Sequence, residues 1–354
     1  MPNKALKYNA GLLSEENVKK YVLPEYKFND PEVSQIKFKD SDKQRAVYRV
    51  ESDRGVYCLK KMYFPEAGLL YVYSAIEWFY RKNINVPKIL STRNNGRFVN
   101  YEGMLFILTP WIEGEKCSYD NIEQILSASE NLAKMHIYAK SFKPIAGSAD
   151  RQCMDDLSKS ISKHFMQLLN CFNLAMKYED KFSKLFLTHF NENFLLAKAS
   201  VEISSPLNSS KLVSSLCHLD YVNKNIIFDE HSSIWIIDFD KCGFDYCVHD
   251  ISYFLRRMLK RDNTTWDLEM AINCLNSYEK IRPLNLEEYR YILSYLAFPQ
   301  KFWKISRDYY NNIKKCNHHS FYCILSSSVE KEQEQTKFVH QFKRYVEEKF
   351  SVKL

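Results

Sequence analysis

The chain has 354 residues, of which 45% are hydrophobic, enough to bury a large core in about two domains. Only 8 glycines accompany 24 tyrosines and 23 phenylalanines, so the composition argues against disorder and against a turn-rich all-β protein. The formal net charge of +7 is modest, and lysines and arginines are scattered among acids, so nucleic-acid binding has little support.

The N-terminal sequence MPNKALKYNAGLLSEEN lacks an apolar run of signal-peptide length. The most apolar segments, GLLYVYSAIEWFY and GMLFILTPWI, are too short and too interrupted to span a bilayer. We therefore expect an intracellular protein whose ten cysteines are reduced. Cys242, Cys247 and His249 have a loosely ligand-like spacing, but without a CxxC framework buried thiols are favoured over a zinc site.

The first third of the chain reads as strands with one helix. Alternating apolar and polar residues predict antiparallel strands over three stretches, which are 34–40, 45–52 and 56–62. A helix is expected over 65–83, because Pro65 and Glu66 suit a helix start. VPKIL at 86–90 and the segment 97–114 read as further strands. This order predicts an antiparallel sheet with one packed helix.

The pattern changes to helical periodicity after Gly114. Long helices are expected over 119–142, about 154–178, about 180–201 and, as a terminal amphipathic helix, 328–350. The sequence therefore predicts an α+β protein with a small β-rich part at 1–109 and a larger helical part at 110–354.

One stretch interrupts the helical part, namely CHLDYVNKNIIFDEHSSIWIIDFD at 217–240. DEHSS has a turn composition between two apolar runs, which predicts a β-hairpin. The expected register pairs Phe228 with Ile234 and Ile226 with Ile236. This register places Asn225 opposite Ile237 and next to Asp238, while Asp220 lies one short loop upstream.

These side chains suit phosphoryl transfer. A carboxylate and an amide oxygen are ligands that Mg²⁺ accepts, together with phosphate and water. A third carboxylate that binds no metal can accept the proton of a hydroxyl group. Positioning and charge neutralisation do most of the catalysis in such reactions.

The motifs also resemble a known family. HLDYVNKN followed by IIDFD resembles the H-x-D-x-x-x-x-N and D-x-D motifs of aminoglycoside phosphotransferases and choline kinases, which are relatives of the protein kinases. YCLKK resembles the strand that carries an ATP-contacting lysine, and LTPWIEG resembles the linker between lobes where adenine binds. Several motifs together, including FPQKFWKISRDYYNN, look most like the spore-coat CotS-type proteins of endospore-forming bacteria.

The resemblance covers nearly the whole chain and implies a bilobal protein-kinase-like fold that binds ATP and Mg²⁺ between its lobes. Carried over by position, it implies that Asp220 is the catalytic base and that Asn225 and Asp238 hold Mg²⁺. Asp240 would be an auxiliary metal or supporting group, and Lys60 would contact the α- and β-phosphates of ATP.

Further roles follow from the same resemblance. His218 would order the catalytic loop, and Lys224 would neutralise charge on the moving phosphoryl group. The linker residues expected near the nucleotide are Leu108, Thr109 and Trp111. Asp250 would brace the catalytic loop and serve as the N-cap of the helix HDISYFLRR.

Strand alternation favours Lys60 for the cleft and makes Lys61 the surface residue. The chain also departs from the family. The loop KDSDKQRA at 39–46 contains no glycine. Two glutamates could pair with Lys60, and Glu77 is preferred to Glu66. Leu219 stands where these kinases usually have glycine.

The sequence thus favours an ATP- and Mg²⁺-dependent kinase that phosphorylates a hydroxyl of a small molecule or saccharide. The alternative is a spore-coat structural or assembly protein that keeps the fold with little or no catalysis. Other spore-coat proteins are expected partners in either case, and the expected location is the mother-cell cytoplasm followed by the spore coat.

Overall fold

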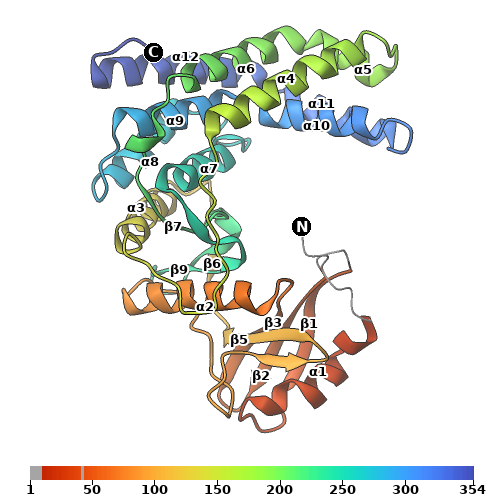
Figure 1. Ribbon diagram of the computed structural model, residues 1–354, viewed down its shortest axis with the longest axis vertical. Helices are drawn as coiled ribbons and strands as arrows, with labels where there is room; N and C mark the ends of the chain where they lie inside the picture. The colour runs from red at the N-terminus through yellow and green to blue at the C-terminus, as the bar shows by residue number, and fades with distance from the viewer. Residues whose placement is uncertain (1–9, 41–43) are drawn as a thin grey trace. The chain divides into compact units, whose positions relative to one another are not determined.

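The computed structural model describes residues 10–40 and 44–354 (Figure 1). The chain forms two compact units, each assembled from separate segments. The first unit contains the chain up to Cys117, residues 135–152 and residues 223–243, and the second contains residues 118–134, 153–222 and 244–354. The sequence predicts a single boundary after Thr109, whereas the structure returns the hairpin segment to the first unit.

The first unit is built around a five-stranded sheet of order β1-β2-β3-β5-β4, in which all neighbours are antiparallel. Its strands are β1 (Glu32–Lys39), β2 (Arg45–Ser52), β3 (Gly55–Lys61), β4 (Val99–Tyr101) and β5 (Met104–Pro110). The predicted helix is also present, as α2 (Glu66–Arg81). The predicted strand at 86–90 is wrong: Pro87 lacks an amide donor, and the segment is held instead by the Leu90 N–H, which donates to the Leu108 carbonyl at 2.8 Å.

A short helix, α1 (Glu15–Tyr21), was not anticipated from the sequence. Its signals are nevertheless local: the Ser14 hydroxyl accepts the Asn17 N–H, acids occupy the first turn and lysines the last. The helix contributes to a core formed with one face of the sheet, whose buried members include Val18, Val22, Tyr48, Leu59, Phe106 and Leu108. The opposite face of the sheet is therefore left for the site described below.

The predicted hairpin is confirmed as β8 (Ile226–Phe228) and β9 (Ile234–Ile236), with the expected register. It pairs with β6 (Glu115–Lys116), so that Glu115 lies opposite Phe228. Gly114 makes this approach possible, because its φ is +143° and a Cβ there would lie 2.3 Å from the Phe228 carbonyl oxygen. The hairpin belongs to the first unit because β6 holds it there.

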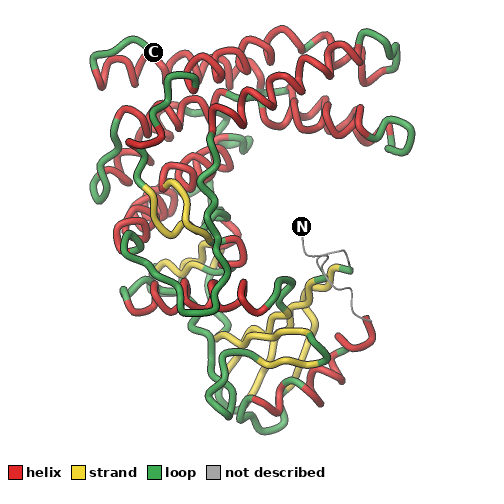
Figure 2. Tube along the Cα trace, in the orientation of Figure 1, coloured by secondary structure: helices red, strands yellow, loops and turns green. Residues whose placement is uncertain are grey.

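The second unit is mainly helical, as the red segments of Figure 2 show. Its strands β7 (Ser214–Cys217) and β10 (Gly243–Tyr246) form a two-stranded sheet. The helices are α3 (Ile122–Tyr138), whose last turn belongs to the first unit, α4 (Leu157–Ala175), α5 (Lys181–Thr188), α6 (Phe190–Ser204), α7 (Cys247–Leu259), α8 (Leu268–Glu279), α9 (Leu286–Ala297), α10 (Gln300–Asn311), α11 (His318–Val329) and α12 (Glu332–Phe350). The single helix expected over 180–201 is broken at His189, where ψ is 4°.

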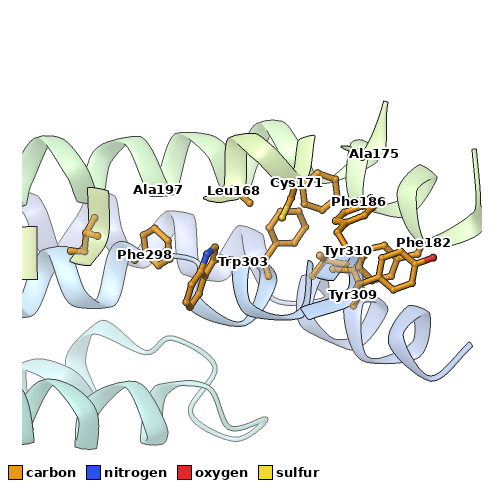
Figure 3. Close-up of a cluster of buried hydrophobic side chains, with 14 residues drawn as sticks. Leu168, Cys171, Ala175, Phe182, Phe186, Ala197, Phe298, Trp303, Tyr309 and Tyr310 are labelled. Carbon is orange, nitrogen blue, oxygen red and sulfur yellow. The ribbon is translucent and has the colours of Figure 1, made fainter. Parts of the chain in front are cut away.

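Aromatic side chains fill the core between α4, α5, α6, α10 and α11 (Figure 3). Phe182 stacks on Tyr309 with ring centroids 3.8 Å apart, and Phe186 stacks on Phe302 at 4.8 Å. Such pairs add to the stabilisation that burial of their area provides. The high aromatic content of the sequence is thus partly explained by this core.

Among the described helices, none has a stretch apolar enough over sufficient length to cross a membrane. All ten cysteines are free thiols.

Lys260, at the end of α7, is a half-buried cation whose pKa is lowered to about 7, first by burial and then by the positive charges of Arg256, Lys301 and Arg257. A lysine in the unfolded chain has a pKa of about 10.4. Burial of the charged ammonium therefore destabilises the folded state fully below about pH 7, and this destabilisation disappears as the pH rises through about 10. We expect Lys260→Met to raise the melting temperature, and to raise it more at about pH 6 than at about pH 9.5. Thermal unfolding at the two pH values measures this, with the exposed Lys304→Met as control; an equal gain at both pH values would contradict it.

Candidate active site

A cavity of about 250 Å³ lies within the first unit, on the sheet face opposite α1. Its wall is largely apolar and includes Val47, Val72, Ile76, Ile107, Ile227 and Phe239. Its polar lining contains most of the residues expected from the sequence, namely Lys60, Thr109, Trp111, Asn225, Asp238 and Asp240. An apolar chamber with a few converging polar groups is the usual form of a small-molecule site.

Lys60 is the centre of the polar end. Its ammonium donates to Asp238 at 2.6 Å and to Asp240 at 2.7 Å. Burial disfavours the charged ammonium, but the two carboxylates outweigh burial, Asp240 more than Asp238, and the pKa of Lys60 is raised. Lys60 therefore stays protonated and is positioned to meet an anion.

The hairpin places Asn225 and Asp238 at the polar end of the cavity. The Ile237 N–H donates to the Asn225 carbonyl at 3.0 Å, so the ladder continues one step beyond β8 and β9. Asp238 then adopts a left-handed conformation with φ of 65°, which aspartate tolerates better than most residues. A 3₁₀ turn over Phe239–Lys241 follows and buries Asp240.

The carboxylates fit a divalent cation. Oδ2 of Asp240 is buried and has no hydrogen-bond partner within the described part of the chain, although its other oxygen accepts from Lys60. An unsatisfied buried carboxylate oxygen is costly unless a cation or water completes it. Together with Asp238 and Asn225 it supplies the hard oxygen donors that Mg²⁺ requires.

Arg151 supports the site and was not singled out from the sequence. Its guanidinium donates to the carbonyls of Asp240 at 2.8 Å, Cys242 at 3.2 Å and Gly68 at 3.2 Å. It also lies over the rings of Phe64 and Tyr71. One side chain thereby ties the turn that carries Asp240 to the first turns of α2.

Replacing Arg151 by methionine is expected to lower the free energy of unfolding by about 2–4 kcal/mol, because charged hydrogen bonds to three carbonyls are lost. Urea denaturation checks this. The control is Arg97→Met, because exposed Arg97 stacks on Tyr73 and should change stability by less than about 0.5 kcal/mol. Equal effects of the two substitutions would show that Arg151 does not hold the turn.

Strand alternation places the predicted linker residues on opposite faces of the sheet. Ile107 and Thr109 of β5 line the cavity, as does Trp111 after it. Leu108 instead points into the core on the other face, and its carbonyl is occupied by the Leu90 N–H. Cys58 of β3 lies opposite Thr109 of β5 and also lines the cavity. The pKa of its thiol is raised to about 11, mainly because the thiol is buried.

Residues 218–222 of the predicted catalytic loop follow β7 in the second unit, whereas the end of the loop, with Asn225, belongs to the first unit. The Asp250 carboxylate accepts the N–H groups of His218 at 2.7 Å and Leu219 at 2.8 Å. The His218 ring nitrogen Nδ1 in turn accepts the Asp220 N–H at 3.2 Å. Asp220 is 6% exposed and lies five residues before Asn225 in the chain. The loop is thus held by its own backbone donors, with Asp250 as the brace.

Leu219 occupies a left-handed conformation with φ of 59°, which explains why glycine suits this position. We expect Leu219→Gly to leave the free energy of unfolding unchanged or to raise it by up to about 1 kcal/mol, because relief of backbone strain offsets lost contacts. Leu219→Val should lower it by more than about 1 kcal/mol, since β-branched residues are poorly tolerated there. Chemical denaturation of both variants checks this; equal destabilisation by glycine and valine would contradict it.

Four expectations are wrong in detail. Glu77 does not pair with Lys60; its carboxylate accepts from Arg81, one helical turn away, at 3.1 Å. Lys61 is not a surface residue: it is 2% exposed and donates to the Gln44 carbonyl, because it lies between Ala46 and Phe106 on the sheet face that the core covers. Asp250 is not an N-cap, since α7 begins at Cys247. Leu108 does not line the cavity.

Lys224 is exposed and is not among the residues that line the cavity. The buried face of α7 is formed by Ile251, Phe254, Leu255 and Met258, which are each 0% exposed.

Comparison with known proteins supports a common origin. A family model described as "Spore coat putative kinase YutH" matches residues 34–342. Spore coat protein S of Bacillus subtilis (strain 168) is 21% identical over 308 residues, which are 85% of this chain and 86% of that protein.

Solved structures show the same fold. An aminoglycoside phosphotransferase from Alicyclobacillus acidocaldarius matches with a TM-score of 0.77 at 18% identity, covering 93% of this chain and 96% of the other. Amicoumacin kinase hAmiN, in complex with AMP-PNP, Ca²⁺ and Ami, matches with a TM-score of 0.65 at 16% identity, covering 95% and 97%. The predicted α+β, aminoglycoside-phosphotransferase-like fold is therefore confirmed.

Proposed function

This chain belongs to the family described as "Spore coat putative kinase YutH", and from that premise we propose that it is an ATP- and Mg²⁺-dependent phosphotransferase acting on a hydroxyl of a small molecule or saccharide. The observation that carries the proposal is the polar end of the cavity. Lys60, Asn225, Asp238 and Asp240 line one chamber, and the buried Oδ2 of Asp240 is unsatisfied within the described residues.

The cavity suits a purine nucleotide. Its apolar wall, formed by side chains such as Val47, Ile107 and Ile227, would bury the base. Lys60, held protonated by two carboxylates, would contact the phosphates. Asn225, Asp238 and Asp240 would hold Mg²⁺, which when bound neutralises and orients the phosphate oxygens.

Asp220 would accept the proton of the acceptor hydroxyl. As that O–H bond breaks, the oxygen forms a bond to the γ-phosphorus, and the bond from that phosphorus to the bridging oxygen of ADP breaks. The Asp220 side chain is kept in place by a loop whose backbone donors are satisfied by Asp250 and His218. The acceptor would be a small molecule or saccharide of the spore coat, and other coat proteins would be partners.

Nucleotide binding and transfer test the proposal separately. We expect ATP with Mg²⁺ at about 100 times its dissociation constant to stabilise the protein by about 2.7 kcal/mol. Incubation with γ-labelled ATP, Mg²⁺ and a panel of sugars, amino alcohols and coat extracts should then label an acceptor. Absence of any nucleotide effect on thermal unfolding at millimolar concentrations would refute the proposal.

A second candidate is a coat assembly protein without catalysis. The glycine-free loop at 39–46 and the pairing of Glu77 with Arg81 instead of Lys60 favour it. This candidate predicts no stabilisation by ATP and Mg²⁺, and no difference in spore-coat assembly between wild type and Asp220→Asn.

A further inference from the structure

The cavity lining has an unusual source of positive charge. Besides Lys60, it contains Lys37 of β1 and Arg45 of β2. Lys37 lies two residues before the glycine-free segment 39–46 and Arg45 lies near its end, and residues 41–43 of this segment lie outside the described chain. The described flanks of this loop therefore present cationic side chains to the cavity.

A β-bulge turns Lys37 toward the cavity. The register between β1 and β2 shifts between Gln35 and Lys37, so Ile36 is an extra residue in β1. Gln35 faces the core, where its amide donates to the Leu13 carbonyl, just before α1, at 3.1 Å and to the Tyr48 hydroxyl of β2 at 3.2 Å. In a regular strand Lys37 would share that face, because side chains two residues apart point the same way. The bulge instead places Lys37 opposite Val47, which also lines the cavity.

Arg45 reaches the same cavity from β2, two residues before Val47. Its guanidinium lies 4.1 Å from the centroid of the Tyr63 ring. Stacking on an aromatic face orients a guanidinium while its in-plane N–H donors remain available for an anion. The ring thus pre-positions Arg45 without satisfying its donors.

The charged side chains that line the cavity are not all paired with each other. Lys60 is matched by Asp238 and Asp240, whereas neither Lys37 nor Arg45 has a carboxylate partner among the described residues. A magnesium-bound nucleoside triphosphate retains about two negative charges at neutral pH. Lys37 and Arg45, which have no carboxylate partner among the described residues, therefore complement the negative charges that remain on the magnesium-bound nucleotide.

We propose that Lys37 and Arg45 form a side-chain clamp for the β- and γ-phosphates of the nucleotide, in place of the backbone contacts that a glycine-rich loop makes. The clamp rests on the proposed function, because it requires that the cavity bind ATP. It also explains why the loop needs no glycine: long flexible side chains reach the phosphates, so the backbone does not have to approach them closely.

Binding measurements with nucleotides of different length test the clamp. Dissociation constants for ATP and AMP in the presence of Mg²⁺ should be measured by calorimetry for wild type, Lys37→Gln, Arg45→Gln and the double variant. We expect each single variant to weaken ATP binding by about tenfold or more and to change AMP binding by less than about threefold. The matched control is Lys27→Gln, which removes the same charge at an exposed residue of the first unit that does not line the cavity.

The outcomes separate the clamp from the proposed function. If wild type binds ATP and the double variant binds it equally well, the clamp is refuted and the kinase proposal stands. If AMP binding falls as much as ATP binding, the two residues act on the whole cavity and the clamp is again refuted. If wild type binds neither nucleotide, the proposed function itself fails. Unfolding temperatures of the ligand-free variants within about 2 °C of wild type confirm that any loss arises in the folded protein.

Discussion

Replacing Asp220 by asparagine is expected to lower kcat by about 10²–10⁴-fold, because the amide cannot accept the proton of the acceptor hydroxyl. The substitution keeps the size of the side chain, and the backbone bond from the Asp220 N–H to His218 does not involve the carboxylate. ATP affinity and the unfolding temperature should therefore stay close to those of wild type. Transfer from γ-labelled ATP to the acceptor identified in the panel measures the effect.

The matched control for Asp220 is Glu230→Gln, because Glu230 is an exposed carboxylate in the turn of the hairpin. It should retain full turnover. If Asp220→Asn also retains full turnover while folding normally, the residue is not the base, and the loop braced by Asp250 has another role.

Replacing Asp238 by asparagine is expected to lower kcat/KM by about 10²–10³-fold, the range seen when one group that stabilises developing charge is removed. The substitution removes a carboxylate that faces the cavity and one of the two anionic partners of Lys60. Turnover should become dependent on much higher Mg²⁺ concentrations, because an amide oxygen is a weaker ligand than a carboxylate. Kinetics over a Mg²⁺ titration, with excess chelator as the metal-free reference, measure this.

Asp240→Asn provides a comparison within the same site. Because Oδ2 of Asp240 is buried and lacks a partner among the described residues, its loss should also weaken the response to Mg²⁺. An unchanged Mg²⁺ dependence in both variants would show that neither carboxylate holds the metal.

Local sequence patterns were sufficient for the elements that depend on neighbours in the chain. The hairpin register was predictable because the turn composition of DEHSS and the two apolar runs leave one pairing that keeps both runs buried. Alternation along β3 correctly placed Lys60 and Lys61 on opposite faces. It did not reveal that Lys61 would be buried, because that depends on the core that covers this face of the sheet, to which its cross-strand neighbours Ala46 and Phe106 belong.

The partner of Lys60 depended on contacts across the chain. Glu77 has an arginine one helical turn away, and this local pair satisfies its carboxylate. Lys60 is 178 residues from Asp238 in sequence, and their contact arises only when the hairpin joins β6 beside the first sheet. Arg151 gave no sequence signal at all, since its three carbonyl partners are 83–91 residues away.

The sequence by itself determined most of the element types, the hairpin and the candidate residues for the proposed chemistry, because periodicity, turn composition and short motifs are local properties. Only the tertiary structure decided which of these side chains meet. It paired Lys60 with two aspartates, left one oxygen of Asp240 unsatisfied within the described residues and placed Lys37 on the cavity side of the sheet through a bulge. The physical reason is that burial, charge pairing and bulges depend on segments distant in the chain, whose approach no local pattern specifies.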